Sequence, residues 1–445
     1  MFASTPAHAT DAEVRTVPPT VTAQPVDAPL APVSWFADGQ GQAALSLIDL
    51  LATSDIEGVD SRQFQIRTLQ RSVRRALAGR DHERAADRML SEAFMRYVLA
   101  VRALPPSKEW TIVDPGAVPG SPPASTMLRD AAMSGSLNAL IKAMPWMHES
   151  YADLRRALID AEREGDGTTG ARLRLNLERV RLLPGAGARR YVLVNTAAQR
   201  LYIYEGGRVV DSMRVVVGKA TQPTPMMAAS IRFAAVNPYW NVPPDLTAER
   251  IAPNVLKNGI GYMKQQGYVV LSDWTEEATA VDPSTIDWQA VADGKAKIRV
   301  RQNPGPSNAM GRMKFMFPNA AGIYLHDTPN KELLKEEARL FSGGCVRLED
   351  APRLAKWLYG HALTVTRGMK PEQHVVLDEP VPVYLAYLTA VPSGGETVFY
   401  DDIYSQDQPR LASSEVAAHQ ASVAAPGRGV IDADRQRTSA AIARR

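Results

Sequence analysis

The spacing of apolar residues changes once along the chain, and this change divides it into two kinds of region. Between residues 42 and 104 apolar side chains recur every three or four positions, and the pattern returns from residue 127 to about 164. This spacing predicts amphipathic helices. From Arg190 onward apolar and polar residues alternate, which predicts β-strands joined by turns. We therefore expect a helical domain over residues 34–170 and a β-rich domain over residues 171–404.

The strand-like segments after Arg190 are short and numerous, and they define the fold class. Such segments, separated by turns, are typical of a β-sandwich or a partly closed barrel. We expect an α+β protein in which helices precede a mostly antiparallel β-sandwich. Residues 243–295 interrupt the strands with helical and loop-forming sequence, and an insertion of this length is typically a lid. Its Tyr262, Tyr268 and Trp274 either line a substrate channel or form the small core of the lid.

Both ends of the chain lack an apolar period. Residues 1–33 are rich in alanine, proline and threonine, and residues 405–445 in alanine and serine, so we expect disordered or export-related tails. The stretch Ala7–Ala9 has the small-x-small form of a cleavage site, and we interpret it as the stub left after removal of a signal peptide. A glycine-rich break at residues 165–170 separates the two domains.

Composition excludes several classes of protein. The 445 residues are 45% apolar and 22% charged, with a net charge of +3, which gives no reason to expect a nucleic-acid partner. No apolar run is long enough to predict a transmembrane segment. Arginines concentrate between residues 62 and 102, either as a solvated helical face or as a docking surface for an anionic polymer. Metal and nucleotide motifs are missing and there is one cysteine, so we expect no metal and no cofactor.

The strongest chemical signal is a histidine followed, 19 residues later, by that cysteine. His326 ends a short apolar strand, and Cys345 follows the glycines Gly343 and Gly344. An imidazole that takes the thiol proton makes the sulfur a nucleophile, and glycines bring backbone N–H groups close to a reacting carbonyl. Read singly, the cysteine is a small buried hydrophobe and the histidine a hydrogen-bonded strand end. Read together, they predict an acyl-transfer site.

Alternation predicts which side chains share this site. Tyr324 and His326 fall on one face of their strand, and Cys345 and Arg347 fall on one face of theirs, with the intervening residues directed to the core. The segment Asn330–Phe341 is expected to form an amphipathic helix that bridges the two strands.

The motifs His326–Pro329 and Ser342–Arg347 resemble the active-site signature of the L,D-transpeptidases, the cysteine enzymes that cross-link bacterial peptidoglycan. The resemblance is closest to their large Gram-negative branch, and it extends to the segment Leu175–Arg181, similar to the helix by which the chain enters the catalytic domain. It implies a helical scaffold domain over residues 34–170 and a capping subdomain over residues 243–295. In those relatives a peptidoglycan-binding module precedes the entry helix, and here only the glycine-rich break occupies that place.

In the site that the resemblance implies, Cys345 is the nucleophile and His326 is its base. The backbone N–H groups of Gly344 and Gly343, together with that of Cys345, form the oxyanion hole. The group that orients the imidazole is open among a backbone carbonyl, Asp327 and Thr328.

Substrate contacts are expected from four side chains: Arg347, Tyr324, Ser342 and Trp274. A guanidinium suits capture of a stem-peptide carboxylate or carbonyl; the alternative for Arg347 is a surface pair with Glu349 or Asp350. The alternative for Tyr324 is simple packing. Many relatives carry histidine or serine two residues before the cysteine and asparagine two after it, where this chain has Gly343 and Arg347.

The resemblance implies acyl transfer from a donor stem peptide of peptidoglycan to an amine of a second stem, forming 3-3 or 1-3 cross-links. It also implies carbapenem inhibitors as ligands and a periplasmic location, which suits a lone thiol. Two alternatives stay open: a peptidase that transfers the acyl group to water, and a non-catalytic protein that binds the cell wall.

Overall fold

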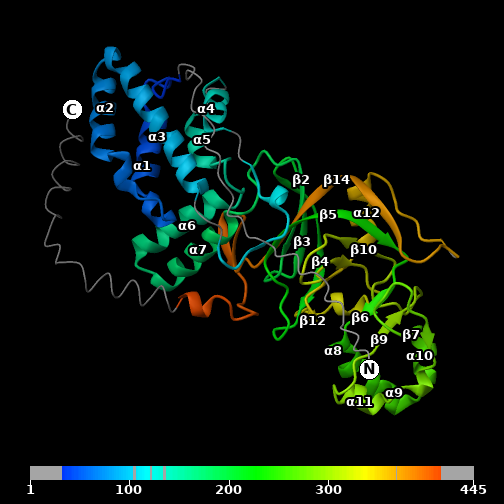
Figure 1. Cartoon of the computed structure of the whole chain (residues 1–445). Helices are drawn as coiled ribbons and strands as arrows, with labels where there is room; N and C mark the ends of the chain where they lie inside the picture. The colour runs from blue at the N-terminus through cyan, green and yellow to red at the C-terminus, as the bar shows by residue number, and fades with distance from the viewer. Residues whose placement is uncertain (1–32, 104–106, 121–122, 134–136, 367, 412–445) are drawn as a thin grey trace, which may run out of the picture.

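The computed structural model describes residues 33–103, 107–120, 123–133, 137–366 and 368–411. The tails predicted at residues 1–32 and 412–445 lie outside the described residues. Helices gather at one end of the molecule, the large sheet occupies the middle, and the insertion lies at the opposite end (Figure 1). The expected α+β class is confirmed.

The first part of the chain is helical because its apolar side chains repeat at helical spacing. Its helices are α1 (Gln42–Ala52), α2 (Ile66–Ala78), α3 (Glu83–Ala103), α4 (Ala124–Met133), α5 (Leu137–Ala143), α6 (Tyr151–Glu164) and α7 (Gly167–Val180), with short 3-10 turns η1 (Ser54–Glu57), η2 (Ser61–Phe64), η3 (Arg80–His82) and η4 (Pro115–Ala117). Their apolar faces meet around Trp146, whose ring packs edge-on against Phe94 at 5.2 Å between centroids. This core joins the helices to two strands of the sheet, β2 (Arg190–Asn195) and β14 (Gln373–Ala386), through residues such as Tyr384.

The junction between α6 and α7 is shorter than the glycine-rich sequence suggested. Helix α6 stops at Gly165, whose φ of 77° is left-handed, and the Asp166 side chain caps α7 by accepting the Thr169 N–H at 3.0 Å. The predicted break at 167–170 is therefore wrong, since these residues form the first turn of α7. In this fully described stretch, residues 165 and 166 alone connect the helices, with no further module between them.

The second part of the chain folds into one sheet whose ends meet. Its strands are β1 (Thr111–Ile112), β2 (Arg190–Asn195), β3 (Arg200–Glu205), β4 (Arg208–Gly218), β5 (Met227–Val236), β10 (Met313–Met316), β11 (Leu325–His326), β12 (Leu340–Ser342), β13 (Val346–Leu348) and β14 (Gln373–Ala386). The order is β1-β5-β10-β11-β13-β4-β3-β2-β14, and β14 also pairs with β5. Six of the ten pairings among the described strands of this sheet are antiparallel. The parallel ones are β11–β13, β1–β5, β12–β4 and β14–β2. The strands enclose an apolar core, which includes Phe315 and Val215, and helix α12 (Ala351–Tyr359) packs against it.

The insertion is a small subdomain with a core of its own. It contains the sheet β6-β9-β7-β8 and short helices: β6 (Trp240–Val242), α8 (Pro244–Leu246), the π-helix η5 (Thr247–Ile251), α9 (Ala252–Asn258), α10 (Gly261–Gln266), β7 (Tyr268–Leu271), β8 (Ala280–Val281), η6 (Pro283–Thr285), α11 (Trp288–Ala292) and β9 (Arg299–Gln302). Because β6 pairs with β9, the subdomain is wider than residues 243–295. The rings of Tyr262 and Tyr268, with centroids 6.0 Å apart, pack against the apolar core of the subdomain. These two residues therefore belong to the small core of the lid.

The chain stays packed beyond residue 404, where a tail was expected to begin. After the hairpin of β15 (Ala390–Ser393) and β16 (Glu396–Phe399), Asp407 is buried and accepts a 2.7 Å bond from Arg179 of α7. The prediction of a tail from residue 405 is therefore wrong for residues 405–411, because this buried ion pair fixes them against α7. The sequence pattern could not predict this ion pair, since Arg179 and Asp407 lie far apart in the chain.

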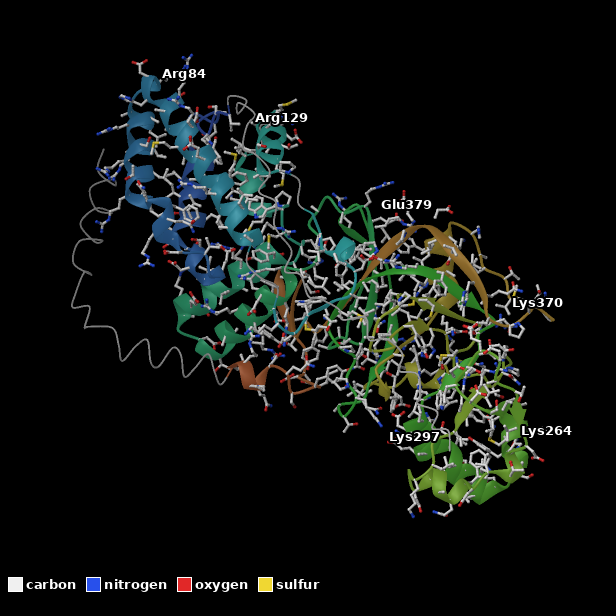
Figure 2. The ribbon with its side chains drawn as sticks, in the orientation of Figure 1. Arg84, Arg129, Lys264, Lys297, Lys370 and Glu379 are labelled. Atoms are coloured by element: carbon white, nitrogen blue, oxygen red, sulfur yellow. The ribbon has the colours of Figure 1, made fainter. Side chains whose placement is uncertain are left out.

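The surface is charged and mixed in sign. Most arginines of the run between residues 62 and 102 are exposed, as expected of a solvated helical face. Charged side chains such as Arg84 on the helical part and Lys264 on the insertion point outward (Figure 2). In the part of the chain that the structure describes, no helix combines the length and apolar character that crossing a bilayer requires.

Candidate active site

The site is built on the parallel pair β11–β13. Their register sets His326 opposite Arg347, and the Tyr324 carbonyl accepts the Val346 N–H at 3.1 Å. Cys345 therefore lies beside Tyr324. Leu325 of β11 follows Tyr324, and Val346 of β13 follows Cys345. Both are buried in the sheet core, as alternation predicts. The structure thus brings Tyr324, His326, Cys345 and Arg347 to one face.

His326 is a buried, neutral imidazole. Its Nδ1 lies 2.6 Å from the backbone carbonyl of Asp327, and because a carbonyl only accepts hydrogen bonds, Nδ1 carries the proton. The carbonyl is thus the orienting group. The Asp327 carboxylate is engaged elsewhere, with the Arg312 N–H at 2.9 Å and Lys331 at 2.8 Å. Burial, followed by the nearby Arg347 charge, lowers the pKa of His326 to about 3, so Nε2 is an unprotonated base at neutral pH.

Cys345 is partly buried, and its surroundings differ from the expected thiol–imidazole pair. In the described structure its Sγ contacts the Gly322 carbonyl at 3.6 Å. Burial raises the pKa of the Cys345 thiol, and hydrogen bonds from the Tyr324 N–H and hydroxyl, with the charge of Arg347, oppose that rise. The parallel register sets His326 opposite Arg347 rather than opposite Cys345. The role of His326 as the base of the thiol stays a prediction.

The glycine loop, Ser342–Cys345, has hydrogen bonds of its own that the sequence did not predict. Gly344 has a φ of 112°, and an added Cβ would lie 3.0 Å from the Ile323 side chain, so this position requires glycine. Its N–H donates to the Ser342 hydroxyl at 3.1 Å. The Gly344 N–H is thus bonded within the loop, and its assignment to the oxyanion hole stays a prediction. Ser342 is buried and shapes the loop, and its role as a substrate contact likewise stays a prediction.

Two backbone donors of the loop stay available. The hydrogen bonds among described residues engage the N–H groups of Gly344 and Val346 and leave those of Gly343 and Cys345 without an acceptor. Both belong to the loop that carries the sulfur, where donors for the oxyanion of an attacked carbonyl are expected.

Arg347 does not form the surface pair considered as its alternative. Glu349 pairs with Arg214 at 2.6 Å, and Asp350 caps α12 by accepting the Arg353 N–H at 3.0 Å. Burial, followed by the charge of Arg250 from η5, lowers the pKa of Arg347. No ion pair within the described residues includes the Arg347 guanidinium, so it is suited to an anionic or carbonyl group of a ligand.

A partly buried ion pair that the sequence did not suggest borders the site. Lys314 is the β10 partner of His326 in the sheet register and pairs with Glu372 at 2.6 Å. The Lys314 charge helps to hold the pKa of His326 down, and Glu372 adds to burial in raising the pKa of Tyr324. No motif surrounds either residue, and only the sheet register brings them here.

The helix predicted at Asn330–Phe341 does not form. The segment contains one 3-10 turn, η7 (Glu332–Leu334), and the strand β12. The Val217 N–H of β4 donates to the Arg339 carbonyl at 2.9 Å, and the Lys219 N–H donates to the Ser342 carbonyl at the same distance. Pairing with β4 therefore takes the place of helical hydrogen bonds. Trp274 is 59% exposed on the loop after β7, and its substrate role stays a prediction.

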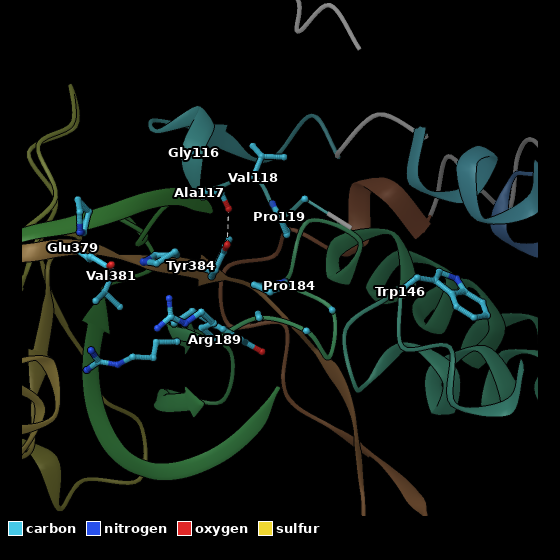
Figure 3. A pocket seen from close by; sticks show the side chains of 18 of the residues that line it. Gly116, Ala117, Val118, Pro119, Trp146, Pro184, Arg189, Glu379, Val381 and Tyr384 are labelled. Carbon is cyan, nitrogen blue, oxygen red and sulfur yellow. Dashed lines mark hydrogen bonds between the residues drawn. The ribbon is translucent and has the colours of Figure 1, made fainter. Parts of the chain in front are cut away.

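Two cavities lie away from the thiol. One, of about 1130 Å³, is bordered by Asp327 and Thr328 on one side and Asn303 on the other. The second, of about 630 Å³, lies between the helical part and the sheet and is lined by Trp146, Pro184 and Tyr384 of β14, with Pro184 between the other two in Figure 3. Cys345 lines neither of them.

Comparison with known proteins identifies the two parts of the chain. Residues 189–383 match the L,D-transpeptidase catalytic domain (YkuD), and residues 31–158 match the Scaffold domain. A protein of Haemophilus influenzae, provisionally named an L,D-transpeptidase, is 35% identical over 243 residues, which cover 53% of this chain and 48% of the relative. The chain thus spans about half the length of this curated relative.

Solved structures give a more distant likeness. The L,D-transpeptidase from Mycobacterium smegmatis is 15% identical with a TM-score of 0.22, over 45% of this chain and 59% of its own. L,D-transpeptidase 1 of Mycobacterium tuberculosis is 14% identical with a TM-score of 0.18, over 45% and 62%. A likeness at this level says nothing of substrate. From the domain matches, the chain carries a scaffold domain followed by a catalytic domain that belongs to the L,D-transpeptidase (YkuD) family.

Proposed function

We propose that this protein is a peptidoglycan L,D-transpeptidase in which Cys345 is the nucleophile and His326 its base. The observation that carries the proposal is the shared face of β11 and β13, where a thiol, a neutral imidazole and a tyrosine meet an arginine that pairs with no carboxylate among the described residues. The catalytic-domain match over residues 189–383 supports the reaction class.

The two protonation states define the order of events. Free enzyme holds a neutral thiol and a neutral imidazole, because burial raises the pKa of Cys345 and lowers that of His326. Bound substrate brings the sulfur and Nε2 into a proton-transfer path, and His326 takes the thiol proton as sulfur attacks. Tyr324 stabilises the thiolate through its N–H and hydroxyl.

The chemical steps balance through His326. The sulfur forms a bond to the carbonyl carbon at the L-centre of the donor's third residue, and the oxyanion is held by the N–H groups of Cys345 and Gly343. The carbon–nitrogen bond to the terminal D-alanine then breaks, and the departing amine takes the proton from His326. An amine of a second stem then attacks the thioester and gives a proton to His326. The carbon–sulfur bond breaks, and the departing thiolate takes that proton back from His326, which restores the neutral pair.

The remaining assignments follow from the same site. Arg347 anchors a carboxylate or carbonyl of the stem peptide, and Trp274 contributes to substrate binding from the insertion. The partners are donor and acceptor stems of peptidoglycan, joined in 3-3 or 1-3 cross-links, and the protein acts in the periplasm. Carbapenems acylate Cys345, since they present a strained carbonyl to the same nucleophile.

Product analysis tests the proposal. Purified protein is incubated with disaccharide-tetrapeptide and the products are separated by mass, with Cys345→Ala as the control. Dimers formed by the wild type and absent from the variant support transpeptidation. Stems shortened without dimers would favour the peptidase, in which water takes the acyl group. Unchanged stems together with retained binding to cell-wall sacculi would favour a non-catalytic wall-binding protein, and dimers formed by Cys345→Ala would refute the nucleophile.

A further inference from the structure

The backbone of the glycine loop accepts a hydrogen bond from Thr224, a residue outside the motif. The Thr224 hydroxyl donates to the Gly344 carbonyl at 2.7 Å and accepts the Gly218 N–H at 2.9 Å. Thr224 is buried, at 2% exposed. It lies in the turn between β4 and β5, 120 residues before the carbonyl it binds. One hydroxyl therefore ties the end of β4 to the glycine loop.

The bonded carbonyl and one free backbone donor belong to the same peptide unit. A trans peptide is planar, so its C=O and N–H point in opposite directions. The Gly344 carbonyl and the Cys345 N–H form such a unit. A hydroxyl that fixes the carbonyl on the inner side therefore directs the Cys345 N–H to the outer side, and a bonded carbonyl also makes its own N–H a stronger donor.

We propose that Thr224 is a positioning residue that aims the Cys345 N–H at the oxyanion, and that Tyr404 holds Thr224 in place. The inference rests on the proposed function, because it concerns the acylation of Cys345. Thr224 touches no reacting atom, and its effect passes through the Gly344–Cys345 peptide. Glycine at 344 is required for the same reason, since this peptide is held at a left-handed φ.

Tyr404 connects this support to the C-terminal segment. Its hydroxyl donates to the Gly218 carbonyl at 2.9 Å and accepts the Thr224 N–H at 3.4 Å. The Tyr404 ring stacks on Tyr387 at 5.2 Å between centroids, and the Tyr387 hydroxyl accepts the Tyr404 N–H at 3.0 Å. Three residues further on, Asp407 binds Arg179 of α7 at 2.7 Å. The segment after β16 is thus part of the active-site support.

The test separates oxyanion stabilisation from thiol reactivity. Thr224→Val removes the hydroxyl and keeps the shape, whereas Thr224→Ser keeps both hydrogen bonds. Each variant is acylated with a carbapenem, which forms an oxyanion, and alkylated with iodoacetamide, which forms none. We expect Thr224→Val to slow acylation by about 10- to 100-fold and alkylation by less than about 3-fold, and Thr224→Ser to restore most of the acylation rate.

Tyr404→Phe has a matched control in the same domain. The Tyr359 hydroxyl likewise bridges a carbonyl and an N–H, those of Val375 at 2.6 Å and Ala234 at 2.8 Å. It lies away from the glycine loop, on the side of α12. We expect Tyr404→Phe to slow acylation about 3- to 10-fold relative to alkylation, and Tyr359→Phe to leave the ratio of the two rates unchanged. Melting curves record any general loss of folding.

The outcomes are distinguishable. Equal acylation by wild type, Thr224→Val and Tyr404→Phe would overturn the positioning role and leave the proposed function intact. Parallel losses of acylation and alkylation, or the same loss in Tyr359→Phe, would also overturn it, because they indicate a structural role only. A wild type that iodoacetamide alkylates but a carbapenem does not acylate would contradict the proposed function itself.

Discussion

Tyr324→Phe should raise the pKa of the Cys345 thiol. Burial raises this pKa, and the two hydrogen bonds from Tyr324 oppose the rise. The substitution removes the hydroxyl bond and keeps the backbone one. A hydrogen bond to a charged group contributes about 1.5–3 kcal/mol, and one pKa unit corresponds to about 1.4 kcal/mol. The expected rise is therefore about 1–2 units, with a corresponding loss of thiolate at neutral pH.

The assay is direct because the chain contains one cysteine. The rate of alkylation by iodoacetamide is measured against pH, and the midpoint gives the thiol pKa. Tyr359→Phe is the control, since it deletes a hydroxyl that does not reach the sulfur. An unchanged midpoint in Tyr324→Phe would refute the reasoning, as it would show that the hydroxyl does not stabilise the thiolate. An equal shift in Tyr359→Phe would refute it as well.

Three further predictions concern strain, acid and the domain junction. Gly344→Ala should lower stability by about 1–3 kcal/mol and slow acylation, because φ is 112° and the new Cβ would crowd Ile323 at 3.0 Å; melting curves and acylation rates check both. Burial lowers the pKa of His148 from 6.5 to about 4, so its stabilising contribution, on the order of 3 kcal/mol, is complete above pH 6.5 and is lost as pH falls to 4. His148→Gln should flatten urea-unfolding free energies across that window, and an unaltered pH slope would contradict this. Arg179→Met should destabilise by about 3–5 kcal/mol, because it leaves the Asp407 carboxylate buried without its 2.7 Å partner; an unchanged urea midpoint would show that the pair is dispensable.

The sequence predicted those features that depend on local pattern. The helical period predicted α1, α2 and α3, and alternation predicted which sides of β11 and β13 face the core. The motif around His326 and Cys345 was enough to find the face on which the candidate site lies. Both residues lie at the ends of short strands in which apolar and polar residues alternate clearly in the sequence. The insertion was found for a similar reason, as an interruption of the strand pattern.

The remaining features depend on contacts between distant parts of the chain. Thr224 binds the Gly344 carbonyl across 120 residues, and Tyr404 binds the Gly218 carbonyl at the end of β4 across 186 residues. No local pattern marks either one. The parallel register of β11 and β13, rather than any motif, sets His326 opposite Arg347 and brings Tyr324 beside Cys345. The segment Asn330–Phe341 has a helical pattern, but it contains only the 3-10 turn η7, and its last residues pair with β4 as the start of β12.

Intact-protein mass spectrometry tests the central claim most directly. Purified protein is mixed with a carbapenem at neutral pH, and the mass is followed over time in the wild type, Cys345→Ala and His326→Gln. We expect one added carbapenem mass on the wild type, located to Cys345 by peptide mapping, none on Cys345→Ala, and formation slowed by about 100-fold or more in His326→Gln. An adduct on Cys345→Ala, or an undiminished rate in His326→Gln, would contradict a cysteine activated by this imidazole.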